Sequence, residues 1–170
     1  ATMGSDVLYA PYLVRNYYGY NSGISIQNVG DLGTSFKIVF TFNGVDYTYQ
    51  HPSKLRAGGI KDLYLPDVVE LDPVDGIDNR SRFGKATIYA TNEDGTLNAS
   101  GELIANINQD NRGGPGIDIE RMGQGATYTA FLAEAGSSDN FIAKFMNNVG
   151  GFTSGYNVSN YSNAAVSCTF

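Results

Sequence analysis

Five carboxylates fall within twelve residues near the middle of the chain and are candidates for a metal site. Calcium prefers several hard oxygen ligands on a flexible loop, and Gly76 inside this stretch would allow such a loop to bend. The spacing differs from that of an EF-hand, and an acidic loop that binds only water is the alternative interpretation. The candidate calcium ligands are Asp67, Glu70, Asp72, Asp75 and Asp78.

The chain contains one histidine and one cysteine, so Ser–His–Asp or Cys–His catalysis would have to use His51. His51 precedes Pro52 at the end of an expected strand and has no catalytic motif beside it, which indicates an exposed turn residue. Cys168 is expected to be a small core residue, with an exposed tail that pairs with a second chain as the alternative. A glycosidase needs two carboxylates that face each other across a cleft, and the acidic stretch lacks a paired partner. We therefore predict a protein that is not an enzyme and has no cofactor besides the candidate calcium ion.

The composition is typical of a secreted β-protein, because only 16% of the residues are charged while glycine and tyrosine number 21 and 12. The net charge of −6 argues against nucleic acid and anionic membranes as partners. No apolar run has the length of a membrane span. We therefore expect an extracellular or cell-surface protein. Sequons that permit N-glycosylation stand at Asn79, Asn98, Asn157 and Asn160.

Alternating apolar and polar residues predict strands at 35–42, 45–50 and 86–91. The first two flank Asn43-Gly44, which is a preferred pair for a two-residue hairpin loop. No segment has a convincing helical periodicity, and turn signals recur along the chain. The sequence thus predicts an all-β fold, an antiparallel β-sandwich of jelly-roll or immunoglobulin-like type with very little helix. The predicted core residues are Phe36, Phe40, Ile88 and Ile107.

The N-terminal segment Val7–Val14 is apolar on both faces, which is typical of a strand that is covered on both sides. Pro11 has no N–H group and should lie where the sheet needs no donor. Because burying one such apolar side chain is worth roughly 1.5–3 kcal/mol, we expect residues 1–15 to be an extension that lies in a groove of a neighbouring subunit. The predicted donor-strand residues are Val7, Leu8, Tyr9, Ala10, Tyr12, Leu13 and Val14.

The stretch from Asn16 to Asn28 recurs 132 positions later, from Asn148 to Asn160. An Asn, two Gly, a Ser and a second Asn stand at the same places in both copies, and the match continues into an alternating stretch that ends at Phe170. Residues 16–170 are therefore predicted to form one sandwich domain, in which 139–170 repeat the opening hairpin. An isolated two-stranded fragment is at best marginally stable in water, so the second copy must pack against something.

The repeated pattern resembles a module of secreted surface proteins from filamentous thermophilic bacteria. In that module an apolar strand with a proline leads into Tyr-Gly-Tyr, then Ser-Gly or Thr-Gly, and then Gln-Asn. The second copy departs from the pattern, with Ala143 in place of proline and Ser159 in place of glutamine. The resemblance implies a β-sandwich outside the cell without known catalytic residues. The matching residues are Pro11, Tyr18–Tyr20, Ser22–Gly23, Gln27–Asn28, Gly84–Ala90 and Ile104–Gln109.

Two copies of one hairpin compete for a single place in the sheet, and passing one copy to the next subunit would resolve the competition. Head-to-tail donation is a heterologous contact, which builds open filaments, and an added strand gains main-chain hydrogen bonds and side-chain pockets together. We therefore predict a structural subunit of an extracellular, pilus-like filament or matrix fibre, analogous to donor-strand pilins, whose partners are copies of itself in an open helical homopolymer. The alternative is a carbohydrate-binding or adhesive module with surface polysaccharide as its partner.

Overall fold

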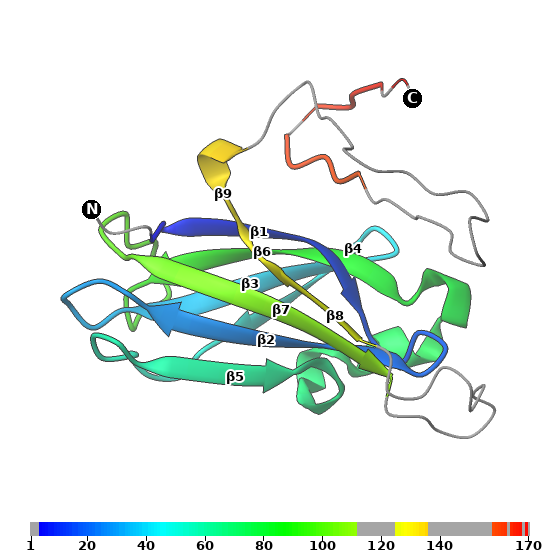
Figure 1. Ribbon diagram of the computed structural model, residues 1–170, viewed down its shortest axis with the longest axis horizontal. Coiled ribbons are helices and arrows are strands. Elements are labelled where there is room, and N and C mark those ends of the chain that lie inside the picture. Colours follow the sequence, from blue (N-terminus) through cyan, green and yellow to red (C-terminus); the bar gives the residue numbers. More distant parts are fainter. Residues whose placement is uncertain (1–3, 112–124, 136–157, 163, 168, 170) are drawn as a thin grey trace.

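The computed structural model describes residues 4–111, 125–135, 158–162, 164–167 and 169, and these residues form two antiparallel sheets packed face to face (Figure 1). The prediction of an all-β antiparallel sandwich is confirmed. The described helical segments are short 3-10 helices, as expected for a fold with little helix. In the part of the chain that the structure describes, no helix is long and apolar enough to cross a membrane.

The two sheets have five and four strands. Their spatial orders are β4-β3-β6-β1-β9 and β5-β2-β7-β8. The first sheet contains β1 (Val7–Val14), β3 (Ser35–Phe42), β4 (Val45–Gln50), β6 (Phe83–Thr91) and β9 (Phe131–Leu132). The second contains β2 (Tyr20–Asn28), β5 (Ile60–Tyr64), β7 (Leu103–Asn111) and β8 (Gly125–Thr129). The described 3-10 segments are η1 (Leu65–Asp67), η2 (Val69–Gly76), η3 (Asn79–Ser81) and η5 (Ala133–Ala135).

The β3–β4 hairpin forms where the sequence predicts it, with the predicted bounds of both strands. Asn43 and Gly44 have φ angles of 49° and 76°, and two left-handed residues in the loop match the twist of the flanking strands. Phe36, Ile38, Phe40 and Phe42 of β3 point inward and Val39 points outward, because side chains alternate between the two faces of a strand. This hairpin therefore fixes one edge of the five-stranded sheet.

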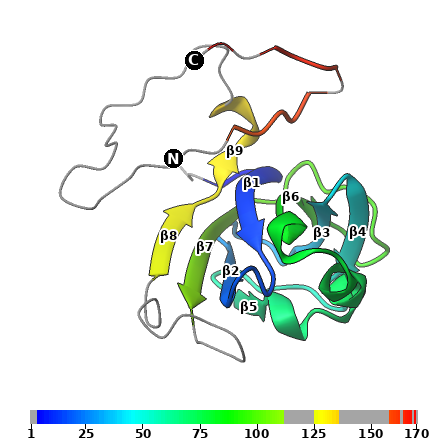
Figure 2. The ribbon, with the colours of Figure 1, turned by 90° about the vertical axis from the view of Figure 1, so that its right-hand side faces the viewer.

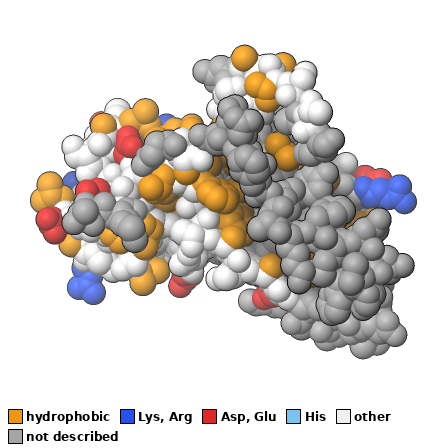
Figure 3. Space-filling view, turned by 45° about the horizontal axis from the view of Figure 1, so that its top comes forward, with side chains coloured by type: hydrophobic (Ala, Val, Ile, Leu, Met, Phe, Trp, Pro, Cys, Tyr) orange, Lys and Arg blue, Asp and Glu red, His pale blue; other side chains and the backbone are white. Residues whose placement is uncertain are grey.

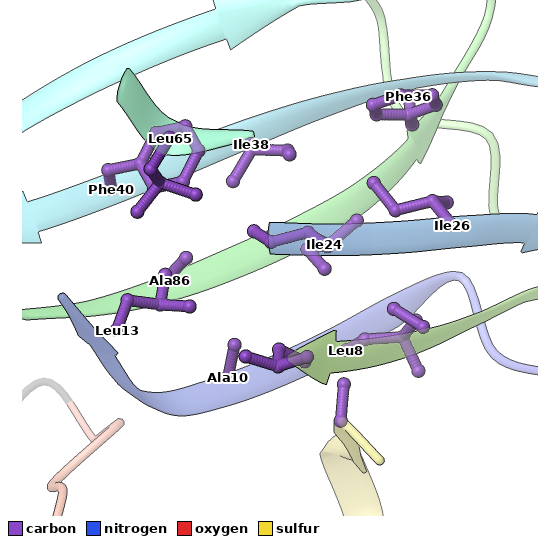
Figure 4. Close-up of a cluster of buried hydrophobic side chains, with 14 of the residues drawn as sticks. Leu8, Ala10, Leu13, Ile24, Ile26, Phe36, Ile38, Phe40, Leu65 and Ala86 are labelled. Carbon is purple, nitrogen blue, oxygen red and sulfur yellow. The ribbon is translucent and has the colours of Figure 1, made fainter. Parts of the chain in front are cut away.

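The core lies between the two sheets and is built from alternate residues of β1, β2, β3, β6 and β7 (Figure 4). The four predicted core residues Phe36, Phe40, Ile88 and Ile107 are all fully buried, so that prediction is confirmed. The 3-10 segments η1 and η2 add buried apolar side chains that sequence periodicity did not reveal. These are Leu65, Leu71 and Val74.

The two open sides of the sandwich are closed differently. On one side, β8 pairs with β7 in the four-stranded sheet and β9, one residue later, pairs with β1 in the five-stranded sheet (Figure 2). One short stretch of chain therefore joins an edge of each sheet. On the opposite side, where β4 and β5 are the edge strands, η1 contacts β2 and η2 contacts β4, so these helices bridge the sheets.

Candidate functional site

The predicted donor strand has a place in its own domain. It forms β1, which pairs with β6 along most of its length and with the two residues of β9 on its other side. Leu8, Ala10, Leu13 and Val14 are buried in the chain's own core, so no neighbouring subunit is needed to cover them. If this strand were donated, it would have to leave the position that it already occupies in the sheet of its own chain. The predicted donor-strand residues Val7, Leu8, Tyr9, Ala10, Tyr12, Leu13 and Val14 all lie in this strand.

Pro11 lies in the register shift between Ala10 and Leu13, which confirms the expectation that it sits where the ladder needs no donor. Within this shift, the side chain of Tyr128 supplies partners for the main chain of Tyr12. The Tyr12 N–H donates to the Tyr128 hydroxyl at 3.2 Å, and that hydroxyl donates back to the Tyr12 carbonyl at 2.5 Å. Burial raises the pKa of Tyr128 to about 12, so its hydroxyl stays protonated and able to donate. The free edge of β1 is thereby blunted against uncontrolled pairing.

Arg15, directly after β1, ties this strand to the acidic stretch. Its side chain is only 2% exposed, and its Nη1 donates to the carbonyls of Leu65 and Val68 at 2.5 and 2.8 Å. Its Nη2 donates to Asp72 Oδ1 at 2.8 Å and to Asp75 Oδ2 at 2.9 Å. This pairing satisfies a buried guanidinium, whose charge would otherwise be costly away from water. Sequence reasoning overlooked Arg15, although a lone charge at the end of an apolar strand is a signal for a buried ion pair.

The structure does not gather the five candidate calcium ligands into one site. Asp75 accepts from Arg15 and from Asn16 Nδ2, and although burial acts to raise its pKa, these hydrogen bonds and the Arg15 charge bring that pKa below its usual value. Asp78 caps η3 by accepting the Arg80 N–H at 2.8 Å. Within the described residues, no group of three or more His, Cys, Asp or Glu side chains is placed to hold a metal ion. The candidate ligands Asp67, Glu70, Asp72, Asp75 and Asp78 are thus divided between Arg15, a helix cap and a separate groove.

That groove has a volume of about 350 Å³ and lies beside the edge strands β4 and β5, with Asp67 and Glu70 in its wall.

His51 directly follows β4 and is only 8% exposed, so the prediction of an exposed turn histidine is wrong. Its ring stacks on Phe36 with the centroids 4.7 Å apart, which holds it in the interior. Burial, with the charge of Lys61 as a smaller cause, lowers the pKa of His51 and keeps it neutral.

In the first copy of the repeated motif, Asn28 ends β2 and organises the turn that follows it. Its Nδ2 donates to the Leu32 carbonyl at 2.8 Å and to the Leu55 carbonyl at 3.0 Å. Its Oδ1 accepts the Gly30 N–H at 3.1 Å. Asn28 is fully buried, and all of these side-chain bonds go to main-chain groups. An asparagine is suited to this position because its amide both donates and accepts.

The second copy forms the same local turn. Asn160 Nδ2 donates to the Ala164 carbonyl at 2.7 Å, four residues on, and the Ser162 N–H donates to Asn160 Oδ1 at 2.9 Å, two residues on. These offsets are the ones found at Asn28. Asn160 is exposed, however, and residues 158–160 belong to no strand. The two copies therefore share these hydrogen-bond offsets, and among the described residues only those of the first copy belong to strands of the sandwich.

The described part of the second copy rests on the outer face of β1 and β6. The Tyr161 ring stacks on the Tyr9 ring with centroids 4.0 Å apart and an interplanar angle of 21°. Its hydroxyl donates to the Ala86 carbonyl at 3.3 Å, and Lys85 Nζ lies 4.6 Å from its ring centroid. Burial raises the pKa of Tyr161, so the phenol remains a donor at neutral pH.

Two further hydrogen bonds hold the residues next to Tyr161. The Ser159 hydroxyl donates to the Pro11 carbonyl at 2.8 Å, and Lys85 Nζ donates to the Asn160 carbonyl at 2.5 Å. Both partners lie on β1 or β6, so the tail bridges the two strands from outside. We call the four residues of β1 and β6 that contact residues 159–161 the tail seat. They are Tyr9, Pro11, Lys85 and Ala86.

The remaining predicted positions are distributed over the surface or lie outside the described residues. Asn79 and Asn160 are exposed, while Asn98 is half-buried and its Nδ2 donates to Thr34 Oγ1 at 3.0 Å. Val166, which corresponds to Phe36 of the first copy, is 60% exposed. Asn157, Cys168 and most of the predicted repeat 139–170 lie outside the described residues.

An aromatic cluster stands apart from the tail seat, around the turn after β1. Tyr17 makes edge-on contacts with Tyr18 and Phe83, whose ring centroids lie 5.0 and 6.1 Å away. Tyr18 and Phe83 are 47% and 43% exposed. The described surface in Figure 3 is largely uncharged, with acidic and basic side chains mostly toward its margins. Such a surface suits contacts with neutral partners.

Comparison with known proteins bears on the fold alone. No family model matches the chain, and no curated protein matches it in sequence. A crystal structure of Thermotoga maritima protein 1070 is similar in fold, with a TM-score of 0.52 over 78% of this chain and 98% of that one. The two sequences are 12% identical. The resemblance to secreted bacterial modules is not tested by these comparisons and stays a prediction.

Proposed function

We propose that this chain is a structural subunit of an extracellular filament, in which copies join head to tail by passing a segment of chain to the next subunit. One observation carries the proposal. The opening motif occurs twice, and its two asparagine turns share the same hydrogen-bond offsets, yet Asn28 is fully buried at the end of β2 while Asn160 is exposed. The second copy repeats the pattern of a segment that already forms β2 in its own chain.

The second copy is therefore the better candidate for the donated segment than β1. The pattern of the second copy predicts strands, and an isolated hairpin of two strands is at best marginally stable in water. A neighbouring subunit offers edges, since β4, β5 and β8 each pair with one strand only among the described residues. An added strand would gain main-chain hydrogen bonds there. A segment and an edge are different surfaces, so the contact is heterologous and the assembly stays open-ended.

Matched substitutions in the two copies test this proposal. Asn160→Ala removes an exposed turn, so we expect an unchanged melting temperature but fewer and shorter filaments in negative-stain electron micrographs. Asn28→Ala removes three hydrogen bonds of a fully buried side chain to main-chain groups, so we expect the subunit itself to lose about 1–3 kcal/mol of stability. Equal filament formation by Asn160→Ala and the unsubstituted chain would remove the second copy from the proposal. The complete absence of filaments from the unsubstituted chain would remove the proposal itself.

A carbohydrate-binding role is the second candidate, and the exposed cluster of Tyr17, Tyr18 and Phe83 favours it. Aromatic rings with exposed faces can pack against the apolar faces of sugars, and neighbouring polar groups can fix their orientation. Affinity electrophoresis in gels that contain neutral polysaccharides tests this role. Retardation that Tyr18→Ala abolishes would support it, and unretarded migration in every polysaccharide would count against it.

A further inference from the structure

The tail seat contacts residues 159–161 through four groups of three chemical kinds, namely a ring, an ammonium and two carbonyls. An aromatic face of Tyr9, an ammonium of Lys85 and the carbonyls of Pro11 and Ala86 meet a ring, a carbonyl and two hydroxyls of residues 159–161. The contacts read the side chains of Ser159 and Tyr161, whereas Asn160 is held by its main-chain carbonyl. The seat therefore favours a segment with a serine two residues before a tyrosine.

The bulge in β1 makes part of this surface available. Because the register shifts between Ala10 and Leu13, Pro11 has no Cα partner on β6, and its carbonyl accepts from a side chain instead. Lys85 serves two contacts at once, as it donates to the Asn160 carbonyl and lies over the Tyr161 ring. A cation close to a ring face and a stacked second ring are both favourable. The seat is thus built from groups on two adjacent strands that keep fixed relative positions.

We propose that the tail seat is an interface between copies of this chain, and that in the assembled state it receives residues 159–161 of the neighbouring subunit. This inference rests on the proposed filament function and names the contact that joins its subunits. Residues 136–157 separate the end of η5 from the described tail, a length of chain that lets the same contacts form within one molecule or between two. Exchange between copies recreates identical contacts and therefore has a low cost. Seat and tail are different surfaces, so their pairing propagates in one direction.

Cross-linking between two differently labelled chains tests the inference. One chain carries Thr87→Cys, which is paired with Tyr9 across β1 and β6, and the other carries Val158→Cys, which neighbours the tail contacts. Both carry Cys168→Ser so that no other thiol reacts, and each has a distinct mass tag. The chains are mixed, assembled and treated with a short thiol-to-thiol reagent. We expect a covalent heterodimer in the filament fraction, and a severalfold lower yield when the second chain also carries Tyr161→Ala.

The outcomes separate this inference from the proposed function. Filaments that contain no cross-linked heterodimer would overturn the inference and leave the filament proposal standing. Absence of filaments would overturn both, and a chain with both cysteines would then show whether the seat is occupied within one molecule. A heterodimer whose yield is unchanged by Tyr161→Ala would also overturn it, because the ring is the largest group that the seat receives.

Discussion

At the residue scale, polar side chains hold the C-terminal part of β1 in place. Arg15 fastens the end of β1 to the acidic stretch, and Tyr128 closes the edge of the same strand at Tyr12. The sequence indicated the acidic residues as candidate calcium ligands, with a solvated acidic loop as the alternative, because spacing along the chain does not reveal a cation supplied from 50 or more residues away. The sequence did identify Asn160 as the counterpart of Asn28, because both stand at the same place in the repeated motif.

Arg15→Ala should lower the free energy of unfolding by about 1.5–3 kcal/mol, because it removes the hydrogen bonds of a buried guanidinium to the Leu65 and Val68 carbonyls and to Asp72 and Asp75. Urea denaturation monitored by circular dichroism measures the loss. The matched control is Lys54→Ala, whose pairing with Glu93 at 3.9 Å is solvent-exposed and worth less than about 1 kcal/mol. Equal effects of the two substitutions would show that Arg15 does not hold the acidic stretch.

The stability of the fold should depend on pH through Tyr128. Its pKa is raised from 10.0 to about 12 in the folded chain, so the neutral form is favoured by folding. This contribution is complete below pH 10 and is lost as the pH rises from about 10 to about 12. Unfolding free energies over this range should therefore fall less steeply in Tyr128→Phe, by up to about 2 kcal/mol in total. Parallel curves for the two proteins would contradict the assigned environment.

At the element scale, alternation was sufficient to predict the strands with one buried face, and it was insufficient elsewhere. The hairpin β3–β4 and its inward phenylalanines follow from period-two patterning and an Asn-Gly loop. Two features did not follow. The 3-10 segments η1 and η2 are too short to show a helical period. The strands that pair with β1, which are β6 and β9, are distant from it in the sequence. Both depend on tertiary contacts that local patterning does not encode.

Close packing of β6 between β1 and β3 predicts a strict need for glycine at position 84. A Cβ on Gly84 would overlap the Thr41 carbonyl and lie 2.9 Å from Phe42 Cδ1. Gly84→Ala should therefore cost about 1–3 kcal/mol through overpacking, measured by thermal unfolding. Gly76→Ala is the control, since a Cβ there meets no atom within 4 Å. A Gly84→Ala protein as stable as the control would mean that the strands are less closely packed than described.

At the scale of the whole molecule, the first copy of the repeated motif lies in the sandwich, and the described residues of the second copy lie outside its strands. Side chains of β1 are buried within the described chain, and the second asparagine turn begins at an exposed residue. The repeat could be predicted from the sequence, but not which copy fills the sandwich. Both copies have the same pattern, and only the packing of β1 and β2 against β6 and β7 distinguishes them.

In the proposed filament, copies of this chain join head to tail without a closing contact. Sedimentation velocity of the chain over a wide concentration range measures the sizes of the assemblies. We expect a series of species that extends to larger sizes as concentration rises, because a heterologous contact leaves both ends of every oligomer available. A single monomeric species at all concentrations, or a dimer that grows no further, would contradict it.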